Sequence, residues 1–206
     1  MTEQQIYFYP VWVRIWHVLN AILCLLLIFS GFSLQYSNPD FSFIKFRMAV
    51  SIHNFAGISL TFSYLLFFLG NYYTENGKFY RLKLKGLAER LYKQIYYYAY
   101  GFFVNEPAPY PVSKSRKFNP LQQVSYLVAL YMVLPLLFVT GWALLFPEFI
   151  LKKLLGISGI FLTAQLHVLM GFLIALFLII HLYVSTMGKS PLSNFKSIVT
   201  GWQKVH

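Results

Sequence analysis

Residues 159–185 read GIFLTAQLHVLMGFLIALFLIIHLYVS, an apolar run without Asp, Glu, Lys or Arg. About 20 consecutive apolar residues are enough to cross a bilayer as a helix. His167 and His181 are fourteen residues apart, four helical turns less about 40°, so both project from nearly the same helix face. They stand about 21 Å apart along the axis, within a hydrocarbon core about 30 Å thick. This spacing predicts two ligand sites stacked across a membrane.

Three further stretches have the same apolar character, so the sequence predicts four membrane-spanning helices. The chain has 206 residues, of which 58% are hydrophobic and 11% are charged, whereas soluble domains are about one quarter charged. We therefore expect an all-α fold, a four-helix bundle forming one integral membrane domain over residues 1–206. The predicted spans cover about residues 11–34, 48–71, 120–146 and 159–185, and a long polar loop covers residues 72–118.

The formal net charge of +11 is distributed unevenly along the chain. Counting Arg14 at the start of the first span, the N-terminal side, the long loop and the C-terminal tail carry thirteen Lys and Arg residues, and the other two loops carry four. Four spans put both termini and the long loop on one side, which the positive-inside rule makes cytoplasmic. We expect a multi-pass protein of the bacterial inner membrane with both termini in the cytoplasm. The basic charge then reflects topology and not binding of nucleic acid.

Local signals refine this arrangement. Pro135 lies inside the third span and predicts a kink there. The single cysteine, Cys24, lies within the first span, where we expect a small apolar filler; one cysteine excludes an internal disulfide and a C-x-x-C-H attachment of c-type haem. Within the long loop, apolar residues at helical spacing predict an amphipathic helix on the membrane surface, which the loop NEPAPYP at 105–111 ends. These residues are Tyr80, Leu84, Leu87, Leu91, Ile95 and Tyr98.

The predicted topology pairs four histidines that lie within the spans. Because the first span runs outward and the second and fourth run inward, His17 and His181 lie in the cytoplasmic half. By the same reasoning, His53 and His167 lie in the outer half. Each depth therefore holds two imidazoles on two different helices, as a bis-imidazole b-type haem requires. The sequence predicts two haems b, an inner one at His17 and His181 and an outer one at His53 and His167.

Histidines within membrane spans can also have roles that involve no haem. A lone intramembrane histidine is often a polar residue that hydrogen-bonds to a neighbouring helix. A zinc site would need three or four ligands at one depth, which two separated pairs do not supply. A proton-coupled transporter could relay protons through histidines, but such relays usually add Asp or Glu within the spans. His206, at the end of the tail, is expected to be solvated.

Small and basic residues complete the predicted haem sites. A macrocycle needs room between helices, and four glycines in the spans provide either this clearance or close helix packing. We expect Arg14, near the inner pair, to neutralise haem propionates, and Arg47 is a weaker candidate beside the outer pair. Each arginine has snorkelling to the membrane interface as its alternative role. The four glycines are Gly31, Gly57, Gly141 and Gly171.

Four sequence segments carry a family resemblance: YPVWVRIWH at 9–17, IHNFAG at 52–57, FNPLQQ at 118–123 and TG at 140–141. With the fourteen-residue spacing of His167 and His181, they resemble the small di-haem cytochrome b subunits of nickel-iron hydrogenases, formate dehydrogenases and thiosulfate reductases. The likeness covers essentially the whole chain and is strongest to thiosulfate reductase cytochrome b. It implies that the four histidines ligate two b haems in the pairing above, with a redox partner outside and a quinone near the inner haem.

The resemblance also implies a quinone site. In the formate dehydrogenase relatives, an Asn in a short Asn-x-x-Gln segment that opens the third span helps to bind the quinone. Asn119 and Gln122 match this segment, whereas Leu121 replaces a Gly found there. Because Asn-Pro is also an ordinary helix start, capping remains the alternative role of Asn119.

The sequence and the resemblance together predict an electron-transfer subunit of a respiratory chain, without catalytic residues of its own. It would connect an extracytoplasmic redox subunit with menaquinone or ubiquinone. That partner is an iron-sulfur protein, a molybdoenzyme, a hydrogenase or a multihaem cytochrome c. The alternatives are an anchor specific to a hydrogenase or a multihaem cytochrome c complex and, in another class, the proton-coupled transporter with a histidine relay.

Overall fold

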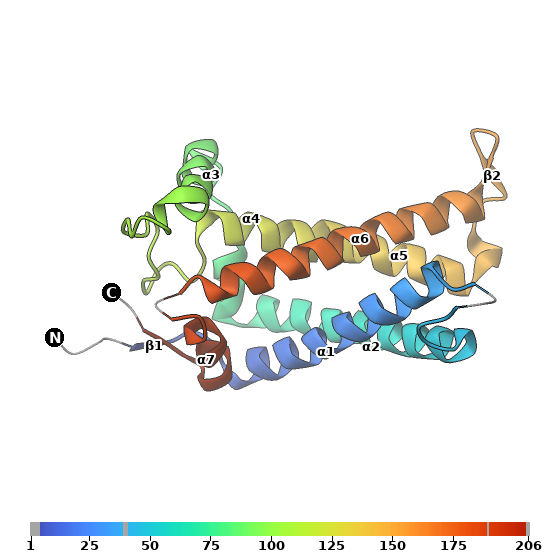
Figure 1. Cartoon of the computed structure of the whole chain (residues 1–206), viewed down its shortest axis with the longest axis horizontal. Helices are drawn as coiled ribbons and strands as arrows, with labels where there is room; N and C mark the ends of the chain where they lie inside the picture. Colours follow the sequence, from blue (N-terminus) through green and yellow to red (C-terminus); the bar gives the residue numbers. More distant parts are fainter. Residues whose placement is uncertain (1–4, 39–40, 189, 205–206) are drawn as a thin grey trace. The chain divides into compact units, whose positions relative to one another are not determined.

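Four long helices dominate the computed structural model, which describes residues 5–38, 41–188 and 190–204 (Figure 1). They are α1 (Val11–Gln35), α2 (Phe46–Tyr73), the segment Pro120–Leu145 and α6 (Gly159–Thr186). Each is long and apolar enough to cross a membrane. Their ends lie within two residues of those expected from the sequence, so the predicted all-α membrane fold is confirmed. His206 lies outside the described residues.

The third long helix is interrupted. It consists of α4 (Pro120–Val128), the π-helical turn η3 (Ala129–Val133) and α5 (Leu134–Leu145). Pro135 has no N–H group, so it cannot donate to the carbonyl of the residue four positions earlier. A π-helical turn directly before it changes the hydrogen-bond pattern at this point. The helix therefore has a π-helical turn close to Pro135, and the predicted kink stays a prediction.

Shorter elements lie at the helix ends. Strand β1 (Gln5–Tyr7) pairs antiparallel with β4 (Trp202–Lys204), with Gln5 opposite Lys204 and Tyr7 opposite Trp202. This pairing brings the first and last described segments together (Figure 1). The remaining elements are η1 (Glu75–Tyr80), α3 (Leu87–Tyr96), η2 (Tyr97–Gly101), η4 (Pro147–Phe149), β2 (Lys153–Leu154), β3 (Ile157–Ser158) and α7 (Ser193–Thr200).

The amphipathic helix of the long loop is shorter than predicted. Gly86 has a φ of +66° and precedes the first residue of α3, so the helix begins at Leu87. A residue in this left-handed conformation cannot continue a right-handed helix. Tyr80 instead ends the 3-10 helix η1, and Leu84 lies in the connection between the two elements. Residues 105–111 form a loop, as predicted.

The described chain forms two compact units, and all four long helices contribute to both. Unit 1 comprises residues 1–14, 69–129 and 179–206, and unit 2 comprises residues 15–68 and 130–178. The expected single domain over residues 1–206 therefore stays a prediction.

Helices in unit 2 approach each other closely through small side chains. Ser30, Ala49 and Ala56 have no exposed surface. The indole N–H of Trp142 donates to Thr61 Oγ1 at 3.3 Å, and that of Trp16 donates to a backbone carbonyl of α2 at 3.1 Å. Small residues and hydrogen bonds between helices are typical of packing in membranes, where lipid removes the hydrophobic driving force.

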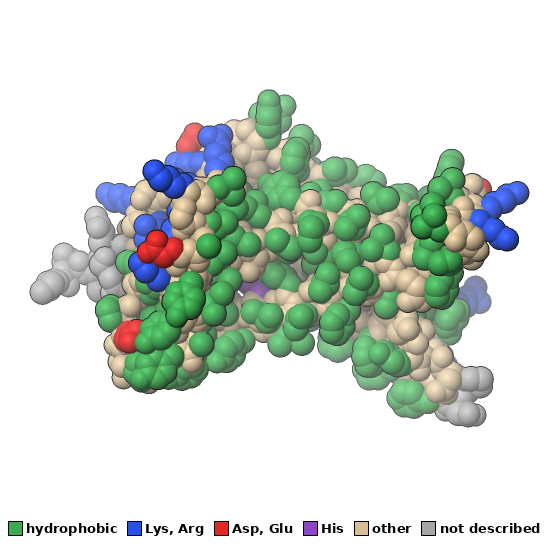
Figure 2. All heavy atoms as spheres, turned by 90° about the horizontal axis from the view of Figure 1, so that it is seen from above, with side chains coloured by type: hydrophobic (Ala, Val, Ile, Leu, Met, Phe, Trp, Pro, Cys, Tyr) green, Lys and Arg blue, Asp and Glu red, His purple; other side chains and the backbone are tan. Residues whose placement is uncertain are grey.

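Large apolar side chains cover the outside of the helices. Phe55, Leu66 and Val139 are each 68 to 70% exposed. On the face shown in Figure 2, hydrophobic side chains predominate, and Lys and Arg side chains gather in separate clusters. An apolar surface of this extent requires contact with lipid or another apolar partner. The structure thus agrees with a membrane as the solvent of these helices.

Candidate functional site

His53 of α2 and His167 of α6 face each other within unit 2. Their ring centroids are 6.2 Å apart, and their planes are inclined at 71°. Because metal–imidazole bonds are about 2 Å long and a ring centre lies about 1 Å behind the bonding nitrogen, an ion held between two imidazoles separates the centroids by about 6 Å. The spacing of His53 and His167 therefore fits a single metal ion bound axially by both rings.

A hydroxyl group lies within hydrogen-bond distance of Nδ1 of each imidazole. Ser30 Oγ of α1 lies 3.0 Å from Nδ1 of His53, and Thr140 Oγ1 of α5 lies 2.9 Å from Nδ1 of His167. Each hydroxyl has one proton, and each donates it at 2.6 Å to the carbonyl four residues earlier in its own helix. The hydroxyls therefore accept the Nδ1–H of the imidazoles. This tautomer leaves both Nε2 lone pairs for a metal, as ligands with a hydrogen-bonded Nδ1–H provide.

A glycine follows each of these hydroxyl residues and touches the same ring. A Cβ on Gly31 would lie 3.2 Å from Cε1 of His53, and a Cβ on Gly141 would lie 3.1 Å from Cε1 of His167. These distances are shorter than ordinary van der Waals contact, so a larger residue would displace the imidazole. We call Ser30-Gly31 and Thr140-Gly141 the two clasps. The clasps lie on α1 and α5, and the two histidines lie on α2 and α6. Each of the four long helices therefore contributes to this site.

The other two predicted glycines leave space beside the histidines. Gly57 follows His53 by one turn, and Gly171 follows His167 by one turn. A Cβ on Gly57 would make only an ordinary 3.8 Å contact with Leu27, and one on Gly171 would meet nothing within 4 Å. This clearance agrees with a bulky group between the helices.

The donor set suits haem better than a bare metal ion. Over the described ranges, no three His, Cys, Asp or Glu side chains come together as a metal site. A zinc centre would need such a set. A haem iron takes four ligands from its porphyrin and needs only axial ligands from the protein. The imidazoles of His53 and His167, whose Nε2 atoms are left for a metal, would supply the two axial ligands.

Comparison with known proteins identifies the family, since residues 8–201 match the family described as prokaryotic cytochrome b561. The chain belongs to the prokaryotic cytochrome b561 family. This cytochrome is also 35% identical over 201 residues to "Putative cytochrome YdhU" of Escherichia coli (strain K12), covering 98% of this chain and 76% of that protein. The predicted resemblance to membrane cytochrome b subunits is confirmed. Membership implies haem b and electron transfer in the inner membrane, which favours a cytochrome over a transporter.

The second predicted histidine pair is divided between the units. His17 belongs to unit 2 and His181 to unit 1, and neither histidine is fully buried. Within unit 1, the His181 ring lies 5.9 Å from the ring of Tyr126 at an angle of 65°. Within unit 2, Asn20 anchors α1 near His17 by donating to Ser63 Oγ at 2.8 Å. The pairing of His17 with His181 stays a prediction.

The two predicted arginines differ in their surroundings. The Arg14 guanidinium donates to the backbone carbonyl of Val199 at the end of α7. Arg47 is exposed at the start of α2. A guanidinium has five N–H donors, so one bond to a carbonyl leaves Arg14 able to bind an anion as well. The propionate role of Arg14 stays a prediction.

Asn119 and Gln122 cap α4. Asn119 Oδ1 accepts the Gln122 N–H at 2.9 Å, and Gln122 Oε1 accepts the Asn119 N–H at 3.1 Å, which is a capping box. Asn119 Nδ2 donates to Tyr98 Oη at 2.7 Å. The alternative capping role is therefore confirmed, and quinone binding by Asn119 and Gln122 stays a prediction.

Tyr98 lies beside the predicted quinone residue Asn119, although in the sequence it forms only part of an apolar stripe. Its hydroxyl accepts a hydrogen bond from Asn119, so its own proton remains available for another acceptor. Burial raises the pKa of Tyr98 to about 12, so it stays protonated at neutral pH. Tyr98 can therefore donate to a carbonyl oxygen next to Asn119.

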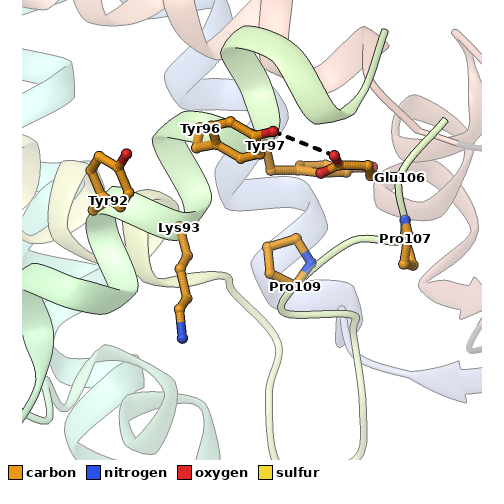
Figure 3. Close-up of a pocket in the computed structure, with 7 residues that line it drawn as sticks. All are labelled: Tyr92, Lys93, Tyr96, Tyr97, Glu106, Pro107 and Pro109. Carbon is orange, nitrogen blue, oxygen red and sulfur yellow. Dashed lines mark hydrogen bonds between the residues drawn. The ribbon is translucent and has the colours of Figure 1, made fainter. Parts of the chain in front are cut away.

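The turn that carries Tyr98 is supported by the loop that follows it. Tyr96 Oη donates to Glu106 Oε1 at 3.4 Å, and the Glu106 N–H donates to the Gly101 carbonyl at 2.8 Å (Figure 3). A small cavity of about 150 Å³ lies between α3, η2 and this loop. These contacts fix the π-helical turn η2 and with it the position of Tyr98.

Proposed function

We propose that this cytochrome is the membrane subunit that transfers electrons between an extracytoplasmic redox subunit and the quinone pool, using two haems b. The arrangement of His53 and His167 carries the proposal. A 6.2 Å ring separation and two hydroxyl-bound Nδ1 atoms are what one axially ligated haem requires. The fourteen-residue spacing from His167 to His181 supports a second haem on the same helix, with His17 as its other ligand.

The haem supplies one-electron redox chemistry when it is bound. The protein's part is to hold the imidazoles, to fix their tautomer and to exclude water from the iron. Ser30 and Thr140 make the Nδ1 side of each ring a hydrogen-bond donor, which raises the basicity of the coordinating nitrogen. Stronger donation to iron favours the oxidised state, so the clasps would hold the outer haem at a lower potential.

The strand pair supports the proposed topology. Because β1 and β4 pair directly, the first and last described segments lie on one side of the membrane. The twelve Lys and Arg residues of the long loop and the C-terminal tail support a cytoplasmic position for that side. His53 and His167 then face the extracytoplasmic side, where the redox subunit would donate or accept electrons. That subunit is an iron-sulfur protein, a molybdoenzyme, a hydrogenase or a multihaem cytochrome c.

The quinone would bind on the cytoplasmic side beside the inner haem. Asn119, Gln122 and Tyr98 gather at the start of α4 in unit 1, the unit that also contains His181. Menaquinone or ubiquinone presents carbonyl oxygens, which accept hydrogen bonds from neutral donors. The phenol of Tyr98 and the amide of Asn119 are such donors.

Haem content and quinone reactivity test the proposal. A pyridine haemochrome assay should give two haems per chain, and acid-acetone should extract both because neither is covalent. A reduced quinone analogue should reduce the haems of the protein in liposomes, and a quinone-site inhibitor should block this. Covalent haem, a single haem or a colourless protein would refute the di-haem assignment, and haems that do not exchange electrons with quinone would refute the quinone role.

A further inference from the structure

Lys117 is a buried cation without an acidic partner. It is 4% exposed, and within the described ranges no carboxylate forms an ion pair with it. Its ammonium group donates to Asn76 Oδ1 at 2.9 Å and lies over the rings of Tyr9, Phe79 and Phe118 at 4.5, 5.4 and 5.5 Å. Aromatic faces stabilise a cation. Burial nevertheless lowers the pKa of Lys117 from its ordinary value of 10.5 to about 8.

The acceptor for Lys117 is held in place by the turn that follows α2. Asn76 is 5% exposed, and its Nδ2 donates to Asn71 Oδ1 at 2.6 Å. Gly77 makes this turn possible, because a Cβ there would lie 2.3 Å from the Asn71 carbonyl oxygen. A carboxylate opposite the ammonium would favour the charged form strongly, whereas a neutral amide does so only weakly. The site therefore accommodates Lys117 in both protonation states.

Water reaches the partner of Lys117 from one side. A cavity of about 450 Å³ is lined by Asn76 and Phe79, and its wall also includes Trp12 and Lys114. A cavity of this size holds several water molecules. Under the proposed topology this end of unit 1 is cytoplasmic, and the cavity brings water to Asn76, the hydrogen-bond partner of Lys117.

Aromatic contacts lead from Lys117 to His181 on the other side. The ammonium group lies 5.5 Å from the Phe118 ring, which lies 5.0 Å from the Tyr126 ring, which in turn lies 5.9 Å from the His181 ring. Charges interact more strongly across such apolar material than across water. The charge of a haem bound at His181 and the charge of Lys117 therefore influence each other.

Other titratable groups surround Lys117. Burial raises the pKa values of Tyr9 and Tyr98 to about 12, and the hydrogen bond from Lys78 lowers the pKa of Glu75. These three groups therefore keep one protonation state on both sides of pH 8. The remaining groups among the described residues are Tyr80 and Tyr126, which pack on Phe118, and Tyr7, Lys78 and Lys114 of the cavity wall.

We propose that Lys117 takes up a proton from the cytoplasmic side when the haem at His181 is reduced. The proposal rests on the proposed function, which supplies the haem and the electron. At a pH at which Lys117 is neutral while the haem is oxidised, one electron gained at the haem would be accompanied by one proton that moves from cavity water to the amine of Lys117. When the electron passes on to the quinone, the ammonium group would release its proton. At a pH at which Lys117 is charged in both redox states, no proton would move with the electron.

A redox titration of the complete protein, at a series of pH values on both sides of 8, tests this coupling. In the wild type, the reduction potential of one haem should not change with pH in the range in which Lys117 is charged in both redox states. At higher pH it should fall by up to about 59 mV for each tenfold decrease in proton concentration. Lys117→Met should remove this slope and lower the potential at neutral pH.

Two further variants separate proton exchange from a structural role. Lys117→Arg keeps a positive charge that does not titrate, so the potential should stay near the wild-type value at neutral pH but lose its slope. Lys85→Met is the matched control, because this lysine also belongs to the long loop but is exposed and does not line the cavity. It should retain the wild-type slope. A wild-type potential independent of pH above 8, or a slope that persists in Lys117→Met, would overturn the proposal.

If Lys117→Met binds no haem, a variant that retains the lysine still tests the proposal. Asn76→Asp places a carboxylate against the ammonium group and raises its pKa, so the slope should begin at a higher pH. An unchanged onset would overturn the proposal. Haem content and quinone reactivity are measured on the same samples. If haem content and quinone reactivity are normal but the pH dependence of the potential is the same in all variants, only the role of Lys117 is refuted. If the wild-type protein binds no haem, the proposed function is refuted together with the role of Lys117.

Discussion

Ser30 Oγ lies 3.0 Å from Nδ1 of His53 and donates its own proton to the Leu26 carbonyl at 2.6 Å. The serine can therefore only accept from the imidazole, which fixes the tautomer that presents Nε2 to a metal. Thr140 does the same for His167 from a different helix. The two clasps therefore orient both imidazoles of the predicted outer haem site through their Nδ1 atoms.

Removing either clasp hydroxyl should weaken haem binding. Ser30→Ala and Thr140→Val leave the imidazole N–H without its acceptor, and loss of such a partner typically costs about 10 to 100-fold in metal affinity. Haem titration of the apoprotein measures the effect. Ser33→Ala is the matched control, because Ser33 is also buried on α1 but its hydroxyl bonds to Ile44. Equal losses in Ser30→Ala and Ser33→Ala would show that the effect is general packing.

Adding a methyl group next to either imidazole should also weaken haem binding, although no hydrogen bond is removed. Gly31→Ala and Gly141→Ala place a methyl group 3.2 and 3.1 Å from the histidine rings, so the rings must turn away from the iron axis. Absorption and electron paramagnetic resonance spectra should change for one haem. Gly70→Ala crowds Trp12 at 2.8 Å instead and should leave the spectrum of that haem unchanged.

The two haems should be lost separately. His53→Ala or His167→Ala removes one axial ligand of the outer haem, and either variant should retain the other haem. Haem quantification and redox titration would show one surviving component, the same in both variants. His17→Ala and His181→Ala should remove the opposite component. If His17→Ala and His53→Ala removed the same component, the pairing would be wrong.

Asn119 combines capping with the proposed quinone contact, and two substitutions separate these roles. Asn119→Asp preserves an N-cap acceptor but loses the amide donor, whereas Asn119→Leu loses both. If the amide serves the quinone, both variants should slow haem reoxidation by a quinone analogue, and only Asn119→Leu should also destabilise the protein, by about 1 kcal/mol. Normal reoxidation in Asn119→Asp would leave Asn119 as a cap. Tyr98→Phe tests the neighbouring donor in the same assay.

Burial of Lys117 should make stability depend on pH. The pKa of Lys117 is about 8 in the folded protein and 10.5 ordinarily, so between these values the unfolded chain binds more protons. The free energy of unfolding should therefore rise with pH in this window, by up to about 1.4 kcal/mol per pH unit. Thermal unfolding in detergent measures it, and the rise should be absent in Lys117→Met. A rise of equal size in that variant would assign it to another group.

Span boundaries were predictable because apolar length alone determines which segments can cross a bilayer. The facing of His53 and His167 followed from counting spans, since an odd or even number of crossings sets the depth of each residue. The clasps were not predictable from spacing: serine and threonine are common in membrane helices, and no local pattern shows that Ser30 faces another helix. Gly86 was missed because the apolar pattern of Leu84 and Leu87 continues across it, although glycine is the residue that most readily adopts a positive φ and ends a helix.

Lys117 shows a different limit. The positive-inside rule depends only on the number of Lys and Arg residues on each side of the membrane, so Lys117 entered the predicted topology as one basic loop residue among others. Its burial depends on Tyr9, Asn76 and Phe79, which lie far from it in the sequence. Composition therefore predicts its side of the membrane but not its environment.

The ribosome completes strand β1 before any of the four spans exists, and it makes β4 only after all four. Until then, the edge of β1 has no partner, and the start of α1 lacks the carbonyl of Val199 that Arg14 contacts. Membrane insertion can therefore proceed helix by helix, but fastening of the first span must wait for translation of the tail. A chain stopped before Trp202 would leave the backbone N–H and C=O groups of β1 unpaired, and such an edge is open to pairing with another chain.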